Sequence, residues 1–307
     1  MISTLNKFLT YDAVISTYNS EESVERALDS IVTQSVLPNQ IFVIDDFSTD
    51  TTYKKLTNYM KYFDNITILK NSENSGQSYS RNLGVSLSKS DVIIFFDDDD
   101  ISLKTRAADH LKMHSQGADV SYVSSIKIYD NGYSYQAINQ DIRNHIFDVS
   151  DLVGKLLVGK DSYRIGKFWV PASTLSVKRI DFHEIGGFNP SMRRLEDVEF
   201  SIQAALISKR ISFSSRVGVE RFGSSSINKG GSIDSNHEKI LIIKYQKLLG
   251  KNLFRESMYL QNLRELYFTK KFGQLLFSIL MNPVKFYQLR SHLVRALRRV
   301  WHDSRKN

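Results

Sequence analysis

Four consecutive carboxylates, Asp97 to Asp100, follow directly on a run of five apolar residues, Val92 to Phe96. A short, uninterrupted apolar run predicts a strand buried on both faces, as in the parallel sheets of α/β proteins. Ligands of open α/β sheets bind beyond the carboxyl ends of the strands, so these acids are expected at a binding site. Alternate residues of an extended chain point the same way. We therefore expect Asp97 and Asp99 to face one ligand and Asp98 and Asp100 to point elsewhere.

The chemistry that suits adjacent carboxylates is the binding of a divalent cation. Neighbouring anions repel one another, and a cation removes that repulsion. Carboxylate oxygens are hard ligands that suit Mg²⁺ or Mn²⁺, and these ions hold nucleotide diphosphates through the phosphate oxygens. The alternative is an exposed acidic turn without a ligand, which the buried strand ahead of the acids makes the weaker interpretation.

The elements that must position these acids alternate along the first hundred residues. Strands are predicted at 11–17, 40–44, 66–69 and 92–96, and the second of them also ends at paired acids, Asp45 and Asp46. Helices are predicted between them, the first capped by Ser20. This alternation predicts a parallel, doubly wound sheet with right-handed crossovers. Neither a GxGxxG fingerprint nor a P-loop follows any strand, so those two nucleotide-binding motifs are excluded.

Composition fits one large or two modest globular domains. The chain has 307 residues, of which 41% are hydrophobic and 24% charged. It has no cysteine, which excludes disulfides and thiolate metal sites. Residues 1–10 hold no apolar segment long enough for a signal peptide, and the longest near-apolar run elsewhere, Leu275 to Met281, is too short to span a membrane. We therefore expect a cytoplasmic protein.

The positive charge belongs to the C-terminal region. Residues 237–307 carry a net charge of +11 and residues 1–236 a net charge of −3, within a total of +8. After Asn282-Pro283, apolar residues from Phe286 to Val300 form one stripe of a predicted helix with basic residues around it. Such a helix is typical of an anionic membrane surface, and the alternative is packing against the domain or in an oligomer. Nucleic acid is not expected, because the region lacks zinc-type and Gly-aromatic signatures.

Six groups of residues, in order along residues 11–200, resemble the motif set of family 2 glycosyltransferases. They are Thr17-Tyr18-Asn19, Ser30 to Gln34, Val43 to Asp50, Asn74 and Gly76 with Arg81-Asn82 and Gly84, Phe96 to Asp100, and Gly186-Gly187-Phe188 with Glu196-Asp197. The resemblance implies a GT-A fold, a Rossmann-like mixed and mainly parallel sheet flanked by helices, here with a C-terminal helical extension. It divides the chain into a domain at 1–236, with a nucleotide-binding half at 1–100 and an acceptor half at 101–236, and a basic helical region at 237–307.

The resemblance also implies an activity. A sugar would pass with inversion from a nucleotide sugar, usually UDP-linked, to a hydroxyl of a glycan acceptor, with Mn²⁺ or Mg²⁺ as cofactor. Together with the basic tail, this predicts a lipid-linked glycan acceptor, a role in cell-surface polysaccharide synthesis, and a peripheral location at the inner face of the cell membrane.

Carried over residue by residue, the resemblance places Tyr18 against the uracil, Asp46 on its imide edge, and Arg81 at the base or the diphosphate. Asp97 would contact the donor ribose or sugar. Residues 216–231 resemble the flexible loop that closes over the diphosphate. The predicted donor-binding residues are Thr17, Tyr18, Asn19, Asp45, Asp46, Arg81, Asp97, Asp98 and Arg221, and the predicted metal ligands are Asp99 and His237. One departure from the family pattern is Phe47, which stands where glycine is common.

The predicted general base is Asp197. Inverting displacement needs an acceptor oxygen in line, a base for its proton, and charge compensation for the departing diphosphate. A helix N-terminus lowers the pKa of a carboxyl and burial raises it, and the sequence leaves this contest open. The alternative is that Glu196 and Asp197 only charge the first turn of a helix. Two other classes of protein are alternatives, a receiver-type signalling domain built on Asp45-Asp46 and a nucleic-acid-binding protein. The second acid cluster and the chain length disfavour the first.

Overall fold

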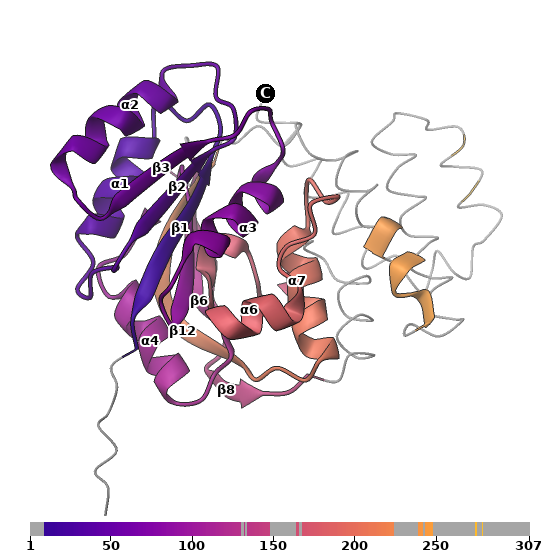
Figure 1. Ribbon diagram of the computed structural model, residues 1–307. Coiled ribbons are helices and arrows are strands. Elements are labelled where there is room, and N and C mark those ends of the chain that lie inside the picture. The colour runs from indigo at the N-terminus through magenta and orange to yellow at the C-terminus, as the bar shows by residue number, and fades with distance from the viewer. Residues whose placement is uncertain are drawn as a thin grey trace, which may run out of the picture. The chain divides into compact units, whose positions relative to one another are not determined.

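The computed structural model describes residues 9–129, 132, 134–147, 164–165, 168–223, 239–241, 243–247, 274 and 278 (Figure 1). The chain divides into two compact units, Met1–Phe147 with Lys167–Gly223, and Asp148–Gly166 with Ser224–Asn307. The predicted boundary at residue 236, the loop at 224–231 and the amphipathic helix after Asn282 lie outside the described residues. Within the described ranges, no helix is both long and apolar enough to cross a bilayer.

The N-terminal half of the sheet is parallel, as predicted. Its strands are β1 (Tyr11–Thr17), β2 (Ile41–Asp45), β3 (Ile66–Lys70) and β4 (Val92–Asp97), in the spatial order β3-β2-β1-β4. The register pairs Thr17 with Asp45 and Ser16 with Asp97. The carboxyl ends of β1, β2 and β4 therefore meet at one edge of the sheet, and all three strands are buried almost throughout because helices cover both faces.

The second half makes the sheet mixed. Beyond β4 the order continues through β11 (Leu175–Lys178), β6 (Val120–Tyr129), β12 (Ile211–Gly223) and β5 (Ile101–Ser102). Strand β11 is antiparallel to both β4 and β6, whereas β12 runs parallel to β6. Strand β7 (Ser134–Ala137) pairs with β6, and β8 (Ile142–His145) pairs with β12. This is the mixed, mainly parallel sheet expected of a GT-A fold.

The segment from Trp169 to Val177 does not form one continuous strand. Two short strands, β9 (Arg164–Ile165) and β10 (Phe168–Trp169), precede a 3₁₀ turn, η2 (Ala172–Thr174), and β11 begins only at Leu175. Pro171 has no N–H to give to a ladder, and the N–H of Ala172 donates to the carboxylate of Asp197. The interruption therefore places backbone next to the predicted base.

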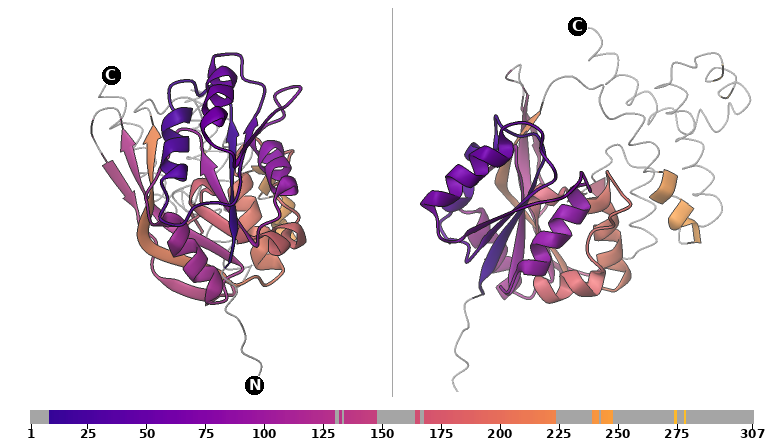
Figure 2. Two further views of the ribbon diagram at one scale, coloured as in Figure 1. Left: turned by 60° about the vertical axis from the view of Figure 1, so that its left-hand side comes forward. Right: turned by 45° about the horizontal axis from the view of Figure 1, so that its top comes forward.

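Helices cover both faces of the sheet (Figures 1 and 2). One face carries α1 (Val24–Val32), α2 (Thr52–Tyr59) with the 3₁₀ turn η1 (Met60–Tyr62), and α4 (Arg106–Ser115). The other carries α3 (Gln77–Leu87), α6 (Arg179–Ile185) and α7 (Glu196–Leu206). Helix α3 packs closely on β1, because a Cβ added to Gly84 would lie 2.6 Å from Val14 Cγ1. Helix α1 begins at Val24, and its N-cap position is Ser23, three residues after the predicted cap, Ser20, whose hydroxyl bonds to Asp98.

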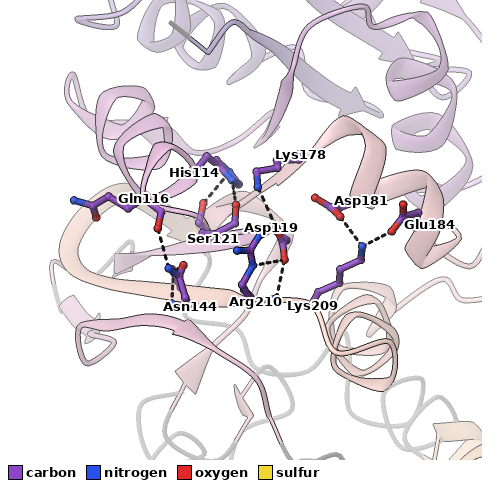
Figure 3. Close-up of polar contacts among 12 residues, drawn as sticks. His114, Gln116, Asp119, Ser121, Asn144, Lys178, Asp181, Glu184, Lys209 and Arg210 are labelled. Carbon is purple, nitrogen blue, oxygen red and sulfur yellow. Dashed lines mark hydrogen bonds and ion pairs between the residues drawn. The ribbon is translucent and has the colours of Figure 1, made fainter. Parts of the chain in front are cut away.

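A cluster of ion pairs joins strand ends at the edge of the sheet opposite the carboxyl end of β4. Figure 3 shows Asp119, directly before β6, between Lys178 of β11 and Arg210, directly before β12. The carboxylate accepts from Arg210 Nη2 at 2.8 Å and from Lys178 Nζ at 3.1 Å. It therefore joins the ends of three neighbouring strands.

Candidate active site

Three of the four consecutive acids converge. Asp97 is the last residue of β4, and Asp98 and Asp99 form a turn, so strand alternation ends before the cluster does. Carboxylate oxygens of Asp97, Asp99 and Asp100 lie within 4.8 Å of one another. Asp100 was expected to point elsewhere, and the turn brings it back to the group. Asp98 instead accepts from the backbone N–H of Tyr18 at 3.2 Å and holds the loop that leaves β1.

The electrostatics of this acid cluster, defined as Asp97, Asp99 and Asp100, fit a bound cation. Burial and the charge of Asp97 raise the pKa of Asp100, and Arg221 only partly offsets this. Desolvation and the charges of the neighbouring acids also raise the pKa of Asp99. Oxygen donors that repel one another at this spacing suit a hard divalent ion such as Mg²⁺ or Mn²⁺. The residues present therefore fit the predicted metal.

Arg221 lies in a strand, not in the flexible loop where the sequence placed it. Strand β12 extends to Gly223 because it pairs residue by residue with β6 as far as Tyr129. Arg221 Nε lies 3.5 Å from Asp100 Oδ2, so the guanidinium sits beside the acid cluster. The other residue predicted from the same part of the chain, His237, lies outside the described residues.

The predicted base lies at the start of α7. Asp197 is 4% exposed, and its carboxylate accepts from Val198 N at 2.7 Å and Ala172 N at 3.2 Å. Burial raises the pKa of Asp197, the neighbouring charge of Glu196 raises it further, and Arg81 with the two backbone donors opposes the rise. Burial therefore prevails over the helix N-terminus in the contest that the sequence left open.

A buried arginine connects the acid cluster to Glu196, the residue before the predicted base. Arg81, on α3, is 2% exposed. It donates from Nη1 to Glu196 Oε1 at 2.8 Å and from Nη2 to Asp97 Oδ1 at 2.7 Å. Gln77, one turn earlier, donates to the same oxygen of Glu196 at 2.6 Å. No local pattern in the sequence indicates this bridge, since it joins residues 16 and 115 positions apart. The donor contact expected of Arg81 stays a prediction.

The predicted nucleotide-binding residues lie together at the ends of β1 and β2. Thr17 is buried, whereas the Tyr18 side chain is 47% exposed and available to a ligand. Asn19 has a positive φ of 52° and its Oδ1 accepts from the backbone N–H of Thr49 at 2.8 Å. The loop after β1 is thus fastened to the loop after β2, which sets Tyr18 beside the paired acids.

Asp45 and Asp46 are both buried and both bonded within the fold. Asp46 accepts from Asn71 Nδ2 at 2.7 Å, Ser75 N at 2.8 Å and Gly76 N at 2.7 Å. A carboxylate has about four acceptor positions, so one remains for the uracil edge that was predicted to bind there. Asp45 accepts from Ser48 N at 3.3 Å and lies 3.5 Å from Lys70 Nζ, and its predicted contact with the donor stays a prediction. Phe47, at the usual glycine position, adopts φ 70°.

Comparisons with known proteins agree with this geometry. The sequence model described as glycosyl transferase family 2 matches residues 12–169. A Haemophilus influenzae protein described as an uncharacterized glycosyltransferase is 24% identical over 62% of this chain and 60% of its own length, so the match spans less than two thirds of that relative. A Bacillus spizizenii poly(ribitol-phosphate) beta-glucosyltransferase is 36% identical over 28% of this chain and 14% of its own.

A solved structure shows the fold. S. aureus TarS 1–349, in complex with UDP-GlcNAc, superposes with a TM-score of 0.61 and 18% identity, covering 92% of this chain and 79% of that one. The shared architecture is the mixed, mainly parallel sheet of the GT-A fold. Since the family match covers more than half of the chain, and its residues carry the acids gathered at the carboxyl edge of the sheet, the protein belongs to glycosyl transferase family 2.

Proposed function

We propose that this family 2 glycosyltransferase moves a sugar, with inversion, from a UDP-sugar to a hydroxyl of a glycan acceptor in cell-surface polysaccharide synthesis. The observation that carries the proposal is the buried Arg81 bridge, which joins Asp97 of the acid cluster to Glu196, the residue next to Asp197. One group of acids suits a metal and a diphosphate. The other supplies a base on a separate element, as an in-line displacement requires.

The donor assignment is supported by the relatives. TarS has been crystallised with UDP-GlcNAc and with UDP, and the B. spizizenii relative is named for glucosyl transfer to poly(ribitol phosphate). In this chain Tyr18 offers an exposed ring for the base, and Asp46 keeps an acceptor position for its imide N–H.

Asp97, Asp99 and Asp100 would hold Mn²⁺ or Mg²⁺, and a bound ion would compensate the charge of the departing diphosphate. Asp197 takes the proton of the acceptor hydroxyl while that oxygen bonds to the anomeric carbon and the bond from this carbon to UDP breaks. Asp197 must be ionised to act, so its raised pKa limits turnover at low pH. Arg81 favours the ionised form.

The experiment is a screen of UDP-sugars for hydrolysis and transfer by the purified protein, with Mn²⁺ or Mg²⁺ and after chelation. We expect one donor to be consumed only when metal is present, and its epimers to be spared. Consumption unaffected by chelation would contradict the metal assignment, and a protein that binds no UDP-sugar would contradict the donor class.

We also propose that the enzyme acts peripherally at the inner face of the membrane on a lipid-linked acceptor, held by its basic C-terminal region. Each Lys or Arg near an anionic surface contributes about 1 kcal/mol, so half of the fifteen bases in residues 237–307 would suffice for binding. Truncation after Asn282 removes the apolar stripe and seven of the fifteen bases, so it should weaken binding to anionic vesicles while a water-soluble acceptor is still glycosylated. A full-length protein that ignores such vesicles at low salt would contradict this location.

A further inference from the structure

Two cations lie side by side at the carboxyl ends of β6 and β12. The parallel register pairs Lys127 with Arg221, and paired residues of neighbouring strands lie about 5 Å apart and point to the same face of the sheet. Arg221 is the residue whose Nε approaches Asp100 at 3.5 Å. Lys127 therefore lies on β6, between β11 and β12, with Arg221 beside it on the neighbouring strand.

The surroundings of Lys127 are unfavourable to its charge. Burial lowers the pKa of Lys127, and the charge of Arg221 lowers it further, while Asp100 and Asp99 only partly offset these effects. Its Nζ lies 5.1 Å from the centre of the Tyr129 ring. Within the described part of the chain its ammonium meets no carboxylate within ion-pair distance. Adjacent like charges in partial burial are stabilised by an anion between them.

A buried hydroxyl on the same face is also unsatisfied. Ser125 lies two residues before Lys127, so strand alternation places both side chains on one face. It is 1% exposed, and its Oγ has no hydrogen-bond partner among the described residues. Buried polar atoms are normally paired, so an unpaired hydroxyl beside two cations indicates a place where a ligand oxygen completes the bonding.

We propose that Lys127 and Arg221, with Ser125 behind them, form a phosphate-binding subsite beside the acid cluster. This rests on the proposed function and extends it to the substrates. The phosphate comes either from the diphosphate of the donor or from a phosphodiester of the acceptor, which are the same chemistry from two sources. The alternative is that both cations only balance the acid cluster. Arg221 does so within 3.5 Å of Asp100, whereas Lys127 makes no such contact in the described residues.

The test compares Lys127→Met with Lys127→Arg and with the same substitution at an exposed lysine, Lys61→Met, whose Nζ bonds only to Asn58 within the described part of the chain. Calorimetry with Mn²⁺ present measures affinity for UDP and for uridine, which lacks phosphate. Steady-state kinetics measure KM for a poly(ribitol phosphate) oligomer and for a neutral glycan. Thermal unfolding confirms that all variants are folded.

If the subsite takes the donor diphosphate, Lys127→Met weakens UDP binding about tenfold or more, as expected for a lost hydrogen bond to a charged group, and leaves uridine binding unchanged. If it takes the acceptor phosphodiester, KM rises by a similar factor for the phosphate-bearing acceptor alone. Lys127→Arg keeps the positive charge, so it should retain most of the wild-type affinity in either case. The proposal is overturned if Lys127→Met matches Lys61→Met in both measurements. Because UDP binding is read without turnover, loss of the subsite and absence of transferase activity are separate results.

Discussion

Replacing Arg81 by glutamine tests the bridge between the two groups of acids. The substitution keeps a polar side chain on α3 but leaves Asp97 and Glu196 facing each other without the charge that joins them at 2.7 and 2.8 Å. Removing one partner of a buried ion pair costs about 3–5 kcal/mol, because the remaining charge stays buried. For a unit of roughly this size, that corresponds to a fall in Tm of roughly 6–20 °C.

The matched control is Arg216→Gln. Arg216 also pairs with an aspartate, with Nη1 at 3.0 Å from Asp109, but its side chain is 69% exposed. An exposed pair of this kind contributes about 0–1 kcal/mol. Thermal and urea unfolding of the two variants at neutral pH should therefore differ severalfold in the stability lost. Equal losses would refute the account of Arg81 as a buried bridge.

Arg81 also has a kinetic signature that a merely structural residue would lack. Its charge opposes the rise in the pKa of Asp197, so its removal moves the acidic limb of the pH–rate profile to higher pH. Arg81→Lys keeps the charge, so its acidic limb should lie closer to that of wild type than the limb of Arg81→Gln does. A profile unchanged in Arg81→Gln would mean that Asp197 does not titrate in turnover.

Three further predictions follow from single sites. Asp99→Ala should abolish transfer and weaken UDP binding in Mn²⁺ while far-UV circular dichroism stays unchanged, and full activity would contradict the metal assignment. Burial lowers the pKa of His114 to about 4. The unfolded chain therefore binds the extra proton first, stability falls by up to roughly 3 kcal/mol between pH 6.5 and 4, and His114→Gln should flatten this dependence in urea titrations. Burial raises the pKa of Asp119, but the hydrogen bonds from Arg210 and Lys178 outweigh burial and hold this pKa well below its ordinary value. Wild type should therefore be more stable than Asp119→Asn at pH 7 and lose that advantage as the pH falls toward 2. Activity should be unchanged in Asp119→Asn.

The parallel half of the fold could be predicted because its signals are local. Each strand from β1 to β4 is a short apolar run between polar turns, and β2 and β4 end in acids that mark the ligand edge. The interruption at Pro171 was harder to predict. An edge strand also tolerates proline, and the N–H of Ala172 is directed by Asp197, 25 residues away.

The candidate site was predictable in its residue types but not in its connections. Asp100 joins the acid cluster because the chain turns at Asp98, and strand alternation does not apply across a turn. The Arg81 bridge and the Lys127–Arg221 pair depend on which helix and strands become neighbours, which no local pattern specifies. The helix after Asn282 lies outside the described residues and stays a prediction.

The most direct test of the proposed transfer is a comparison of UDP affinity and turnover in Asp197→Asn. Asparagine keeps the shape of the side chain at α7 but cannot accept the proton of the acceptor hydroxyl. With the preferred donor and acceptor, we expect the Kd for UDP to stay within about twofold of wild type while kcat falls by about 10² or more. Wild-type turnover in Asp197→Asn, or loss of UDP binding together with the rate, would contradict the assignment of Asp197 as the general base.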